Sequence, residues 1–538
     1  MKENNETTRQ SAIEPLRNRG AALVIGLVAL FIVAALSAAY VAMTTSSLVR
    51  VDRQERNYVA SALAEAGVDY TIVQESNAIT VDNLRFVSRS YDLNSLLNSL
   101  IAGGGGTVTV APLAGDPSYA KIRASTTYRG EPEVVESVAR CAVLGPWNAA
   151  IFAGSGQGGG VINGNVKVAG SVIILGNGEP FTDTNGNGVR DVGESYTDVD
   201  GDGSYDQPLT SSDTAMGLNG TAVVQNNYSG MPAALSSRIP ALATAPYGGE
   251  DVLSLRAELR VKRGKVSLSG TGEVGATNVS GDADKETADA VYVTHGWSGN
   301  QGEAGVHSDN GTSSAYDLGN KLSFPNLTDP YTDPDTGTSY ASYSAYLNAN
   351  SLVVADDIDG SSDGRIVISD SINNFSASDG NGSISWNKAT NTLTVSGIVR
   401  MNVSLDLAVK DKPVTYVGSG TLYSTGDVRV HSDLLSQSTF PTVDALGVIA
   451  GNSMYLATGA GESQIKMTGA FYAQNKIVSS KQNEIAGTFV SNYFDLGTNV
   501  PAIYQVPSLA DHLPPGMPPG ARFVVVRLIS WRRLAAGS

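Results

Sequence analysis

The chain has 538 residues, of which 41% are hydrophobic and 16% are charged. Because a domain usually holds roughly 100–200 residues, this length excludes a single small module, and the hydrophobic content excludes wholesale disorder. The formal net charge of −16, from 36 basic and 52 acidic residues, opposes contact with phosphate backbones, so we expect no nucleic-acid partner.

The N-terminal part of the sequence predicts a membrane-spanning helix. Residues 21–43 carry no charged side chain, and as a helix they are about 35 Å long, enough to cross the hydrocarbon core of a bilayer. Arg17 and Arg19 precede this run, and the positive-inside rule places them in the cytoplasm and the later residues outside it. The run is too long for a secretory signal peptide and continues without turn residues. We therefore expect one transmembrane and stem helix over 21–75.

Two short motifs flank the apolar run of this predicted helix. Arg19-Gly20 lies directly before the apolar run, and a polar helical stretch after it ends in ALAEAG. In this order the motifs resemble the PilX-type N-terminal domain of type IV pilus assembly proteins, over roughly residues 15–75. The resemblance implies a prepilin with a basic leader at 1–20, cleavage by prepilin peptidase between Gly20 and Ala21, and a helix that packs among other pilin subunits.

One position departs from the pattern of the major pilins. They carry a glutamate near the start of the mature chain, where it neutralises the free amine of a neighbouring subunit; here that position is Ile25. A subunit without this carboxylate resembles the minor pilins, which cap or prime a filament. The resemblance thus implies a minor pilin-like protein of a type IV pilus or a secretion pseudopilus, anchored in the bacterial inner membrane with its ectodomain periplasmic or extracellular. The alternative is a surface adhesin that uses the helix only as an anchor.

Residues 76–146 predict a small α+β unit. Apolar spacing indicates a helix over 91–101, and the glycine run at 103–106 predicts a break after it. Alternating apolar and polar residues predict strands and an intervening turn, with strands at 107–110, 119–128 and 134–143 and the turn at 129–132. A stem helix followed by a small antiparallel sheet is similar to the globular head of pilin-like proteins.

A long glycine-rich region, residues 147–508, lacks a sustained helical period and is expected to be mainly β. Within it, segments that begin with glycine, cross a polar break and resume with apolar residues follow one another at spacings of 23, 27, 22 and 18; they start at Gly397, Gly420, Gly447, Gly469 and Gly487. Units this small cannot bury their own apolar faces, so they favour a stacked β-solenoid, similar to a right-handed β-helix. Residues 161–178 show the same pattern of short apolar runs separated by glycine and polar residues. A β-sandwich is the alternative, and residues 509–538 are expected as a C-terminal tail.

An acidic segment at 178–210 carries the spacing of calcium ligands. Oxygen donors stand at positions 1, 3, 5, 7, 9 and 12 of a loop with Gly188 at position 6; they are Asp183, Asn185, Asn187, the carbonyl of Val189, Asp191 and Glu194. This is the EF-hand loop pattern, in which hard Ca²⁺ takes about six to eight oxygens. A second loop repeats positions 1 to 9 but has Leu209 at position 12; its donors are Asp198, Asp200, Asp202, Ser204 and Asp206. The sequence predicts bound Ca²⁺, against the alternative of a solvated acidic turn.

The sequence carries no recognisable catalytic motif, and we expect the protein not to be an enzyme. Its one cysteine, Cys141, falls in a predicted strand, and its histidines are expected as surface or loop residues; they are His295, His307, His431 and His512. A β-helical polysaccharide-active enzyme, with carboxylates on separate coils, is the enzymatic alternative. Exposed Tyr, Ser, Thr and Asn side chains would suit contact with a glycan or another surface ligand.

Overall fold

The computed structural model describes residues 14–81, 83–155, 162–164, 166–210, 212–247, 250–274, 290–293, 297–299, 322–496 and 501–534. It divides into two compact units. Unit 1 comprises Met1–Ile79, Asn83–Cys141 and Val526–Ser538, and unit 2 comprises Thr80–Asp82 and Ala142–Val525. Most of the predicted leader, residue 161, His295, His307 and the end of the predicted tail lie outside the described residues.

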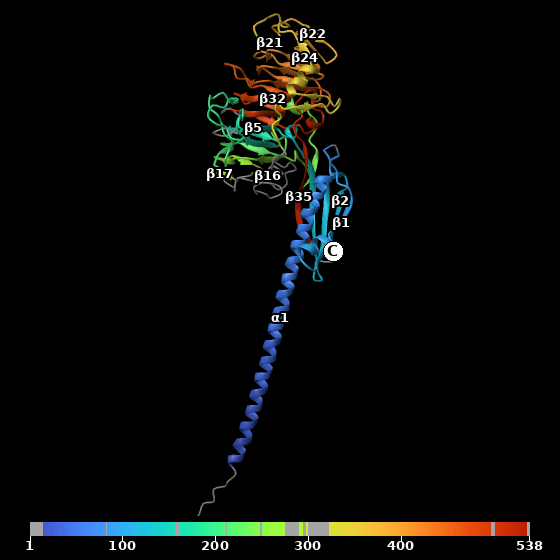
Figure 1. Ribbon diagram of the computed structural model, residues 1–538, viewed down its shortest axis with the longest axis vertical. Coiled ribbons are helices and arrows are strands. Elements are labelled where there is room, and N and C mark those ends of the chain that lie inside the picture. Colours follow the sequence, from blue (N-terminus) through green and yellow to red (C-terminus); the bar gives the residue numbers. More distant parts are fainter. Residues whose placement is uncertain are drawn as a thin grey trace, which may run out of the picture. The chain divides into compact units, whose positions relative to one another are not determined.

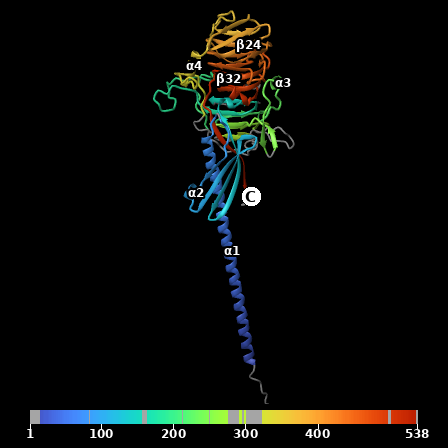
Figure 2. The same cartoon turned by 90° about the vertical axis from the view of Figure 1, so that its right-hand side faces the viewer.

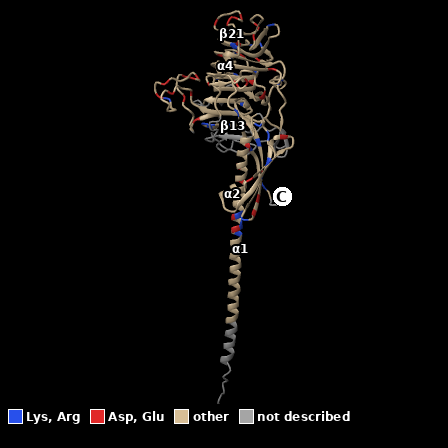
Figure 3. Ribbon diagram, turned by 45° about the vertical axis from the view of Figure 1, so that its right-hand side comes forward, with Lys and Arg blue, Asp and Glu red and all other residues tan. Residues whose placement is uncertain are grey.

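Unit 1 begins with one uninterrupted helix, α1 (Glu14–Ala78) (Figure 1, Figure 2). The single helix predicted over 21–75 is confirmed, and it extends a few residues further at each end. Side chains from 26 to 51 are all exposed, and from Gly26 onward the first charged residue is Arg50 (Figure 3). A helix that is apolar on every side suits a membrane, and α1 is long and apolar enough to cross one.

The second half of α1 packs against a five-stranded sheet of order β1-β2-β3-β4-β35. The strands are β1 (Arg89–Asp92), β2 (Gly104–Leu113), β3 (Asp116–Tyr128), β4 (Glu131–Leu144) and β35 (Phe523–Leu534), with the short helix α2 (Asn94–Leu100) between β1 and β2. Pairing from β1 to β4 is antiparallel, and β2, β3 and β4 correspond to the expected strands. The helix expected over 91–101 is shorter, because residues 91 and 92 belong to β1 and pair with β2. The predicted turn is tight, because Arg129 and Gly130 take φ angles of 47° and 84°, which a two-residue hairpin loop requires.

The glycine run at 103–106 was expected to break the chain, but β2 begins inside it. A Cβ at Gly104 would lie 2.9 Å from Cδ1 of Leu63, and one at Gly106 would lie 2.6 Å from the carbonyl oxygen of Ser125. Both distances are shorter than Cβ atoms show in proteins, and at Gly106 the neighbouring atom is backbone, which does not move aside easily. The run is therefore strand because only glycine lets this part of β2 approach α1 and β3 so closely.

The C-terminal segment differs from the expected tail, because β35 is the fifth strand of the unit 1 sheet, next to β4. Arg533 donates two hydrogen bonds to the Glu133 carboxylate, at 2.7 and 2.8 Å. Arg532 and Lys121 both contact Glu136, the latter at 3.6 Å. Burial alone would raise the pKa of Glu136, but these two cations outweigh it and lower the pKa. The last strand is thus fastened to the sheet by charge as well as by backbone pairing.

Unit 2 is built mainly from parallel strand pairs, and successive glycine-led repeats lie next to one another. The paired positions are Gly397–Gly420, Thr421–Gly447, Gly447–Ala470 and Gly469–Gly487. The register therefore keeps the leading glycines of neighbouring repeats within one residue of each other. An antiparallel β-sandwich, the alternative from the sequence, lacks such pairing.

The parallel pairs form three rows of strands. The first row, after β20 (Leu352–Val354), is β24 (Thr392–Met401), β27 (Ser419–Ser424), β30 (Ala445–Ala450), β32 (Lys466–Ser479), β33 (Glu484–Asp495), β5 (Ile151–Ser155), β8 (Val172–Asn177), β13 (Glu258–Val261) and β16 (Ala290–Val293). The second row is β21 (Arg365–Ile368), β25 (Ser404–Leu407), β28 (Val428–Val430), β31 (Met454–Leu456) and the end of β32. The third row is the start of β24, β26 (Val414–Val417), β29 (Leu434–Ser436), the starts of β32 and β33, β34 (Ala502–Tyr504), β7 (Lys167–Ala169), β10 (Val223–Gln225) and β15 (Glu273–Val274).

Smaller elements complete unit 2. A further parallel set contains β6 (Ile162–Gly164), β9 (Thr214–Leu218), β14 (Lys265–Leu268) and β17 (Trp297–Gly299). Antiparallel pairs are formed by β11 (Thr244–Tyr247) with β12 (Glu250–Leu253), by β18 (Tyr331–Thr332) with β19 (Ser339–Tyr340), and by β22 (Phe375–Ser378), β23 (Gly382–Asn387) and β24. The short helices are η1 (Pro146–Asn148), α3 (Ala233–Ser236), α4 (Tyr343–Ala349) and η3 (Pro507–Asp511).

The chain enters the first row in its middle. β5, near the start of unit 2, pairs with β33, near its end. From β5 the early strands continue outward through β8 and β13 to β16, whereas the later strands run from β24 back to β33. Figure 1 shows this order, with β16 and β24 towards opposite ends of unit 2 and β5 and β32 between them.

Inward side chains of the first row form a continuous apolar column. Its members pair in register and are fully buried; they are Val399, Leu422, Val448, Phe471, Phe489, Ile151, Val172 and Leu259. Burying one such side chain contributes about 1.5–3 kcal/mol. The column explains how repeats that cannot fold alone are stable when they are stacked.

Candidate functional site

The residues of the predicted processing site lie within α1. Gly20 and Ala21, the predicted cleavage pair, and Ile25 are part of the same continuous helix as the apolar run. Arg17 and Arg19 precede the pair within one helical turn. The predicted cleavage point therefore adjoins the apolar run directly and is not in a separate loop.

The first acidic loop is closed by its own hydrogen bonds. Asp183 accepts from three backbone amides within the loop, at 2.6 to 3.2 Å. Asn185 and Asn187 donate their side-chain amides to Asp191, at 2.6 and 3.0 Å. Glu194 accepts from the backbone and the hydroxyl of the residue after Asp183, at 2.7 and 2.6 Å. The side chains of the predicted ligands in this loop are thus linked to one another or to the backbone of one compact turn.

The bend that the loop pattern requires is present. Gly188 has a φ of 75°, a conformation that glycine adopts without strain. The next amide, of Val189, donates to Oδ1 of Asn187 at 2.8 Å. The side chains of Val189 and Val192 are exposed at the tip of the loop.

The second loop brings more carboxylates together than the first. Oxygens of Asp198, Asp200 and Asp202 lie within 4.8 Å of one another, and so do oxygens of Glu179, Asp200 and Asp206. Among the residues that the structure describes, these groups have the spacing of a metal site. Glu179 precedes both loops and was not predicted, and it supplies a carboxylate where the second loop has an apolar residue at position 12.

Glu179 holds the second loop at two points. This side chain is 2% exposed, and its carboxylate accepts from the backbone amides of Val199 at 2.5 Å and Asp206 at 3.2 Å. The amide of Ser204 donates to Asp202 at 2.6 Å. Burial, followed by the charges of the neighbouring aspartates, raises the pKa of Asp206 to about 6. Burial is also the largest cause that raises the pKa of Glu179 and of Asp200, so the ionised forms of these three carboxylates are disfavoured without a cation.

An aromatic cluster joins the two loops. The rings of Tyr196 and Tyr205 are 5.5 Å apart, and Phe181 lies 5.9 Å from Tyr205. The Arg190 guanidinium of the first loop stacks over both tyrosines, at 4.6 and 4.8 Å from their ring centres. Lys476 of β32 donates to the backbone carbonyl of residue 200. The acidic segment is thus a packed substructure of unit 2.

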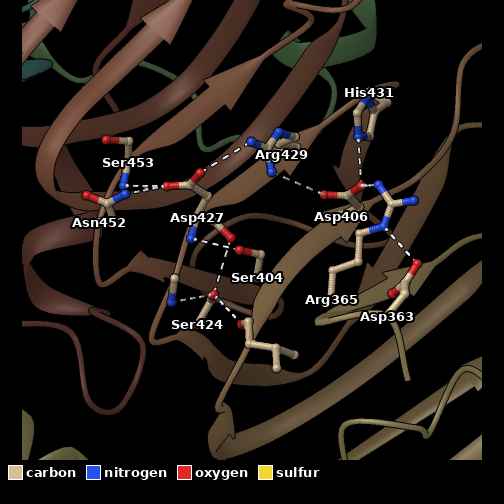
Figure 4. A network of polar contacts seen from close by, with 12 residues as sticks. Asp363, Arg365, Ser404, Asp406, Ser424, Asp427, Arg429, His431, Asn452 and Ser453 are labelled. Carbon is tan, nitrogen blue, oxygen red and sulfur yellow. Dashed lines mark hydrogen bonds and ion pairs between the residues drawn. The ribbon is translucent and has the colours of Figure 1, made fainter. Parts of the chain in front are cut away.

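A second polar cluster faces outward from the second row of strands (Figure 4). Asp406 of β25, Arg429 of β28 and Tyr455 of β31 are paired in register, so their side chains stack in a line. Arg365 donates to Oδ2 of Asp406 at 3.2 Å. Arg429 donates to Asp427 at 3.2 Å and lies 5.1 Å from the ring centre of Tyr455. We call Arg365, Asp406, Arg429, His431 and Tyr455 the lateral cluster.

His431, directly after β28, lies between two carboxylates. Its Nδ1 is 2.6 Å from Oε1 of Glu462, and its Nε2 is 3.6 Å from Oδ2 of Asp406. The pKa of His431 is raised above its ordinary value, first by its contact with Asp406 and also by Glu462. Burial of the ring opposes this increase but does not cancel it. This histidine was expected as a plain surface or loop residue, but it belongs to the lateral cluster.

Sequence reasoning missed the lateral cluster because only strand register brings its members together. A signal was present nonetheless. Asp406, Arg429 and Tyr455 follow the leading glycines of their repeats by nine, nine and eight residues. Charged or aromatic residues recurring at one place in successive repeats would have predicted a line of functional side chains along one face.

Comparison with known proteins reveals a likeness in fold. No family model and no curated protein matches the sequence. Among solved structures, the chain is similar to the crystal structure of the competence-associated pilin ComZ from Thermus thermophilus, with a TM-score of 0.52 and 17% identity. The match covers 89% of this chain and 97% of that chain. In this chain the fold is a long N-terminal apolar helix followed by mostly β structure.

Proposed function

We propose that the protein is a minor pilin-like subunit of a type IV pilus or a related filament. Helix α1 anchors it in the bacterial inner membrane, and prepilin peptidase cleaves the leader between Gly20 and Ala21. Unit 2 is displayed in the periplasm or outside the cell. The subunit caps or primes the filament, and its displayed domain contacts a surface ligand such as a glycan.

The observation that carries this proposal is the construction of α1. Its first half exposes apolar side chains on all sides, whereas its second half buries Ala60, Leu63, Ala64 and Val68 against a sheet. An anchor alone has no need to continue unbroken into a folded domain. A pilin uses one helix both to hold the membrane and to pack among other subunits, and the similar fold of a competence-associated pilin agrees with this use.

Ile25 supports a minor role in the filament. A buried amine in the filament core is tolerable when a carboxylate pairs with it, and this chain offers no carboxylate at that position. Such a subunit suits an end of the filament, where fewer neighbours surround it.

We also propose that unit 2 is a β-solenoid, similar to a right-handed β-helix. Consecutive strands of one repeat belong to different rows: β27, β28 and β29 lie in the first, second and third rows. The same holds for β24, β25 and β26. Parallel rows that the chain visits in turn are the arrangement expected when repeats coil around an apolar interior.

Calcium binding by the acidic segment is a further part of the proposal. Carboxylate, amide and carbonyl oxygens are the ligands that Ca²⁺ prefers, and neither loop offers nitrogen or sulfur donors. In the second loop, Glu179 with Asp198, Asp200, Asp202 and Asp206 supports a site. In the first loop we propose the same ligands as the sequence pattern predicts, from Asp183 to Glu194.

Sheared filaments provide the test. We expect the protein to be recovered with filaments in cells that make it at its natural level, at a small fraction of the major pilin when both are quantified by mass spectrometry. Recovery only in the membrane fraction would favour the adhesin that uses α1 as a plain anchor. Amounts close to those of the major pilin would contradict the minor role.

A further inference from the structure

The lateral cluster keeps polar groups that the fold does not use. Arg429 uses Nη2 to reach Asp427, and its Nη1 lies 4.0 Å from Oδ1 of Asp406, too far for a hydrogen bond. That carboxylate oxygen is buried and accepts no hydrogen bond within the described residues. The hydroxyl of Tyr455 likewise has no partner in the part of the chain that the structure describes. The lateral cluster therefore keeps a buried acceptor without a hydrogen bond beneath the more exposed Arg429 guanidinium.

The cluster also has the shape of a line. Neighbouring strands are about 4.8 Å apart, and Asp406, Arg429 and Tyr455 occupy successive strands in register. The side chains of Arg365 and Arg429 are 51% and 37% exposed, whereas that of Asp406 is 7% exposed beneath them. A ligand would thus meet the guanidinium groups of Arg365 and Arg429, which Figure 4 shows on either side of Asp406. The aromatic ring of Tyr455 lies next to Arg429 on the following strand.

Charge decides which class of ligand suits the track. Two arginines and His431 stand among the carboxylates of Asp363, Asp406, Asp427 and Glu462, so each cation already faces an anion. The four carboxylates outnumber the cations, so a polyanion finds no excess of positive charge. A polycation first meets the two guanidinium groups, which are more exposed than the carboxylates of Asp406, Asp427 and Glu462. A neutral chain of hydroxyl-bearing rings does find suitable partners, because its hydroxyl groups both donate and accept and its ring faces can lie on tyrosine.

We propose that the lateral cluster is a binding track for a neutral, extended glycan. The inference rests on the proposed function, since it names the ligand class for the displayed domain, and it assigns contact to Arg365, Arg429 and Tyr455. Asp406 and His431 hold the two arginines in position from below.

Binding is measured with the purified full chain in detergent, by calorimetry against neutral hexasaccharides of glucose, N-acetylglucosamine, mannose and xylose. Oligogalacturonate and heparin hexasaccharides serve as anionic probes. We expect at least one neutral probe to bind, and its affinity to fall about tenfold or more in Tyr455→Ala and Arg429→Met. Tyr340→Ala, which removes a partly exposed tyrosine in β19, should bind like the parent chain.

If Arg429→Met lowers the melting temperature, its loss of affinity has a second explanation in lost stability. Tyr455→Ala, which removes no hydrogen bond, then decides whether the lateral cluster binds the glycan. Failure of every neutral probe to bind, tightest binding to an anionic probe, or parental affinity in Tyr455→Ala would each overturn the proposal. None of these outcomes bears on recovery with filaments, so failure of the glycan track and failure of the pilin-like role are distinguishable.

Discussion

Gly67 sets how closely α1 approaches its sheet. A Cβ at this position would lie 3.2 Å from Cγ2 of Val108 and 3.3 Å from Cδ1 of Leu93, closer than ordinary van der Waals contact. Glycine inside a helix costs about 1 kcal/mol relative to alanine. The close approach explains why the residue is there despite that cost, which the sequence alone does not reveal.

Enlarging this position should weaken unit 1. Gly67→Leu forces Val108 and Leu93 apart, and overpacking of this kind costs about 1–3 kcal/mol. Ala62→Leu is the matched control, because residue 62 is exposed on the same helix. Hydrogen exchange of α1 and β2 in the full chain reports the change. Equal protection in both variants would mean that the contact is loose.

His431 should make the stability of unit 2 depend on pH. The groups that face it are Asp406 on β25 and Glu462 after β31, and Arg365 and Arg429 stand around Asp406. Because the folded state raises the pKa of His431 above its ordinary 6.5, its contribution is complete below that pH. The contribution is lost as the pH rises through the higher pKa of the folded state.

Thermal unfolding from about pH 6 to about pH 8.5 measures this effect. We expect the melting temperature of unit 2 to fall more steeply in the parent chain than in His431→Gln. His512→Gln, outside the lateral cluster, should keep the parental slope. If His431→Gln keeps the parental slope, the two carboxylates do not hold a proton on His431 in the parent chain.

At the scale of elements, alternation and spacing in the sequence predicted α1, strands β2 to β4 of unit 1 and the position of the acidic loops, but not β1 or β35. They did not predict that Glu179 joins the second loop, because it lies 19 residues before Asp198 and belongs to no loop pattern. They also misjudged the glycine run before residue 107. A glycine that breaks a chain and a glycine that allows two elements to touch look alike until the neighbouring element is known.

Removing calcium should loosen the acidic segment. Without a cation the carboxylates of Glu179, Asp200 and Asp206 repel one another, whereas a free Ca²⁺ concentration of a hundred times Kd stabilises the folded state by about 2.7 kcal/mol. We expect a chelator to lower the melting temperature of unit 2 and to expose residues 178–210 to protease. Magnesium should substitute poorly, because it demands a tighter octahedral shell.

Variants separate the two loops. Glu179→Gln, which keeps one oxygen acceptor, and Glu194→Ala should each reproduce part of the chelator effect when calcium is present. Asp335→Asn changes an exposed acidic residue elsewhere in unit 2 and should have no effect. Identical melting with and without chelator, together with no metal by elemental analysis, would leave the segment as an acidic turn held by its aromatic cluster.

At the scale of the whole molecule, the sequence predicted the kinds of element but not the order in which they meet. The pairing of β5 with β33 joins residues more than 300 positions apart, and no local pattern encodes such a contact. The same is true of β35, whose partner β4 lies before the whole of the glycine-rich region. Repeats in the sequence predict that strands stack. The strand at which the chain enters the stack depends on long-range pairings such as that of β5 with β33, which the repeats do not encode.

The central claim is that α1 is the helix of a processed pilin-like subunit. The most direct measurement is the N-terminal sequence of the protein recovered from sheared filaments, with Gly20→Val as the matched variant. The account predicts a mature chain that begins at Ala21, and a Gly20→Val chain that stays unprocessed in the membrane and is missing from filaments. Peptides from residues 1–19 in the assembled protein, or normal assembly of Gly20→Val, would contradict it.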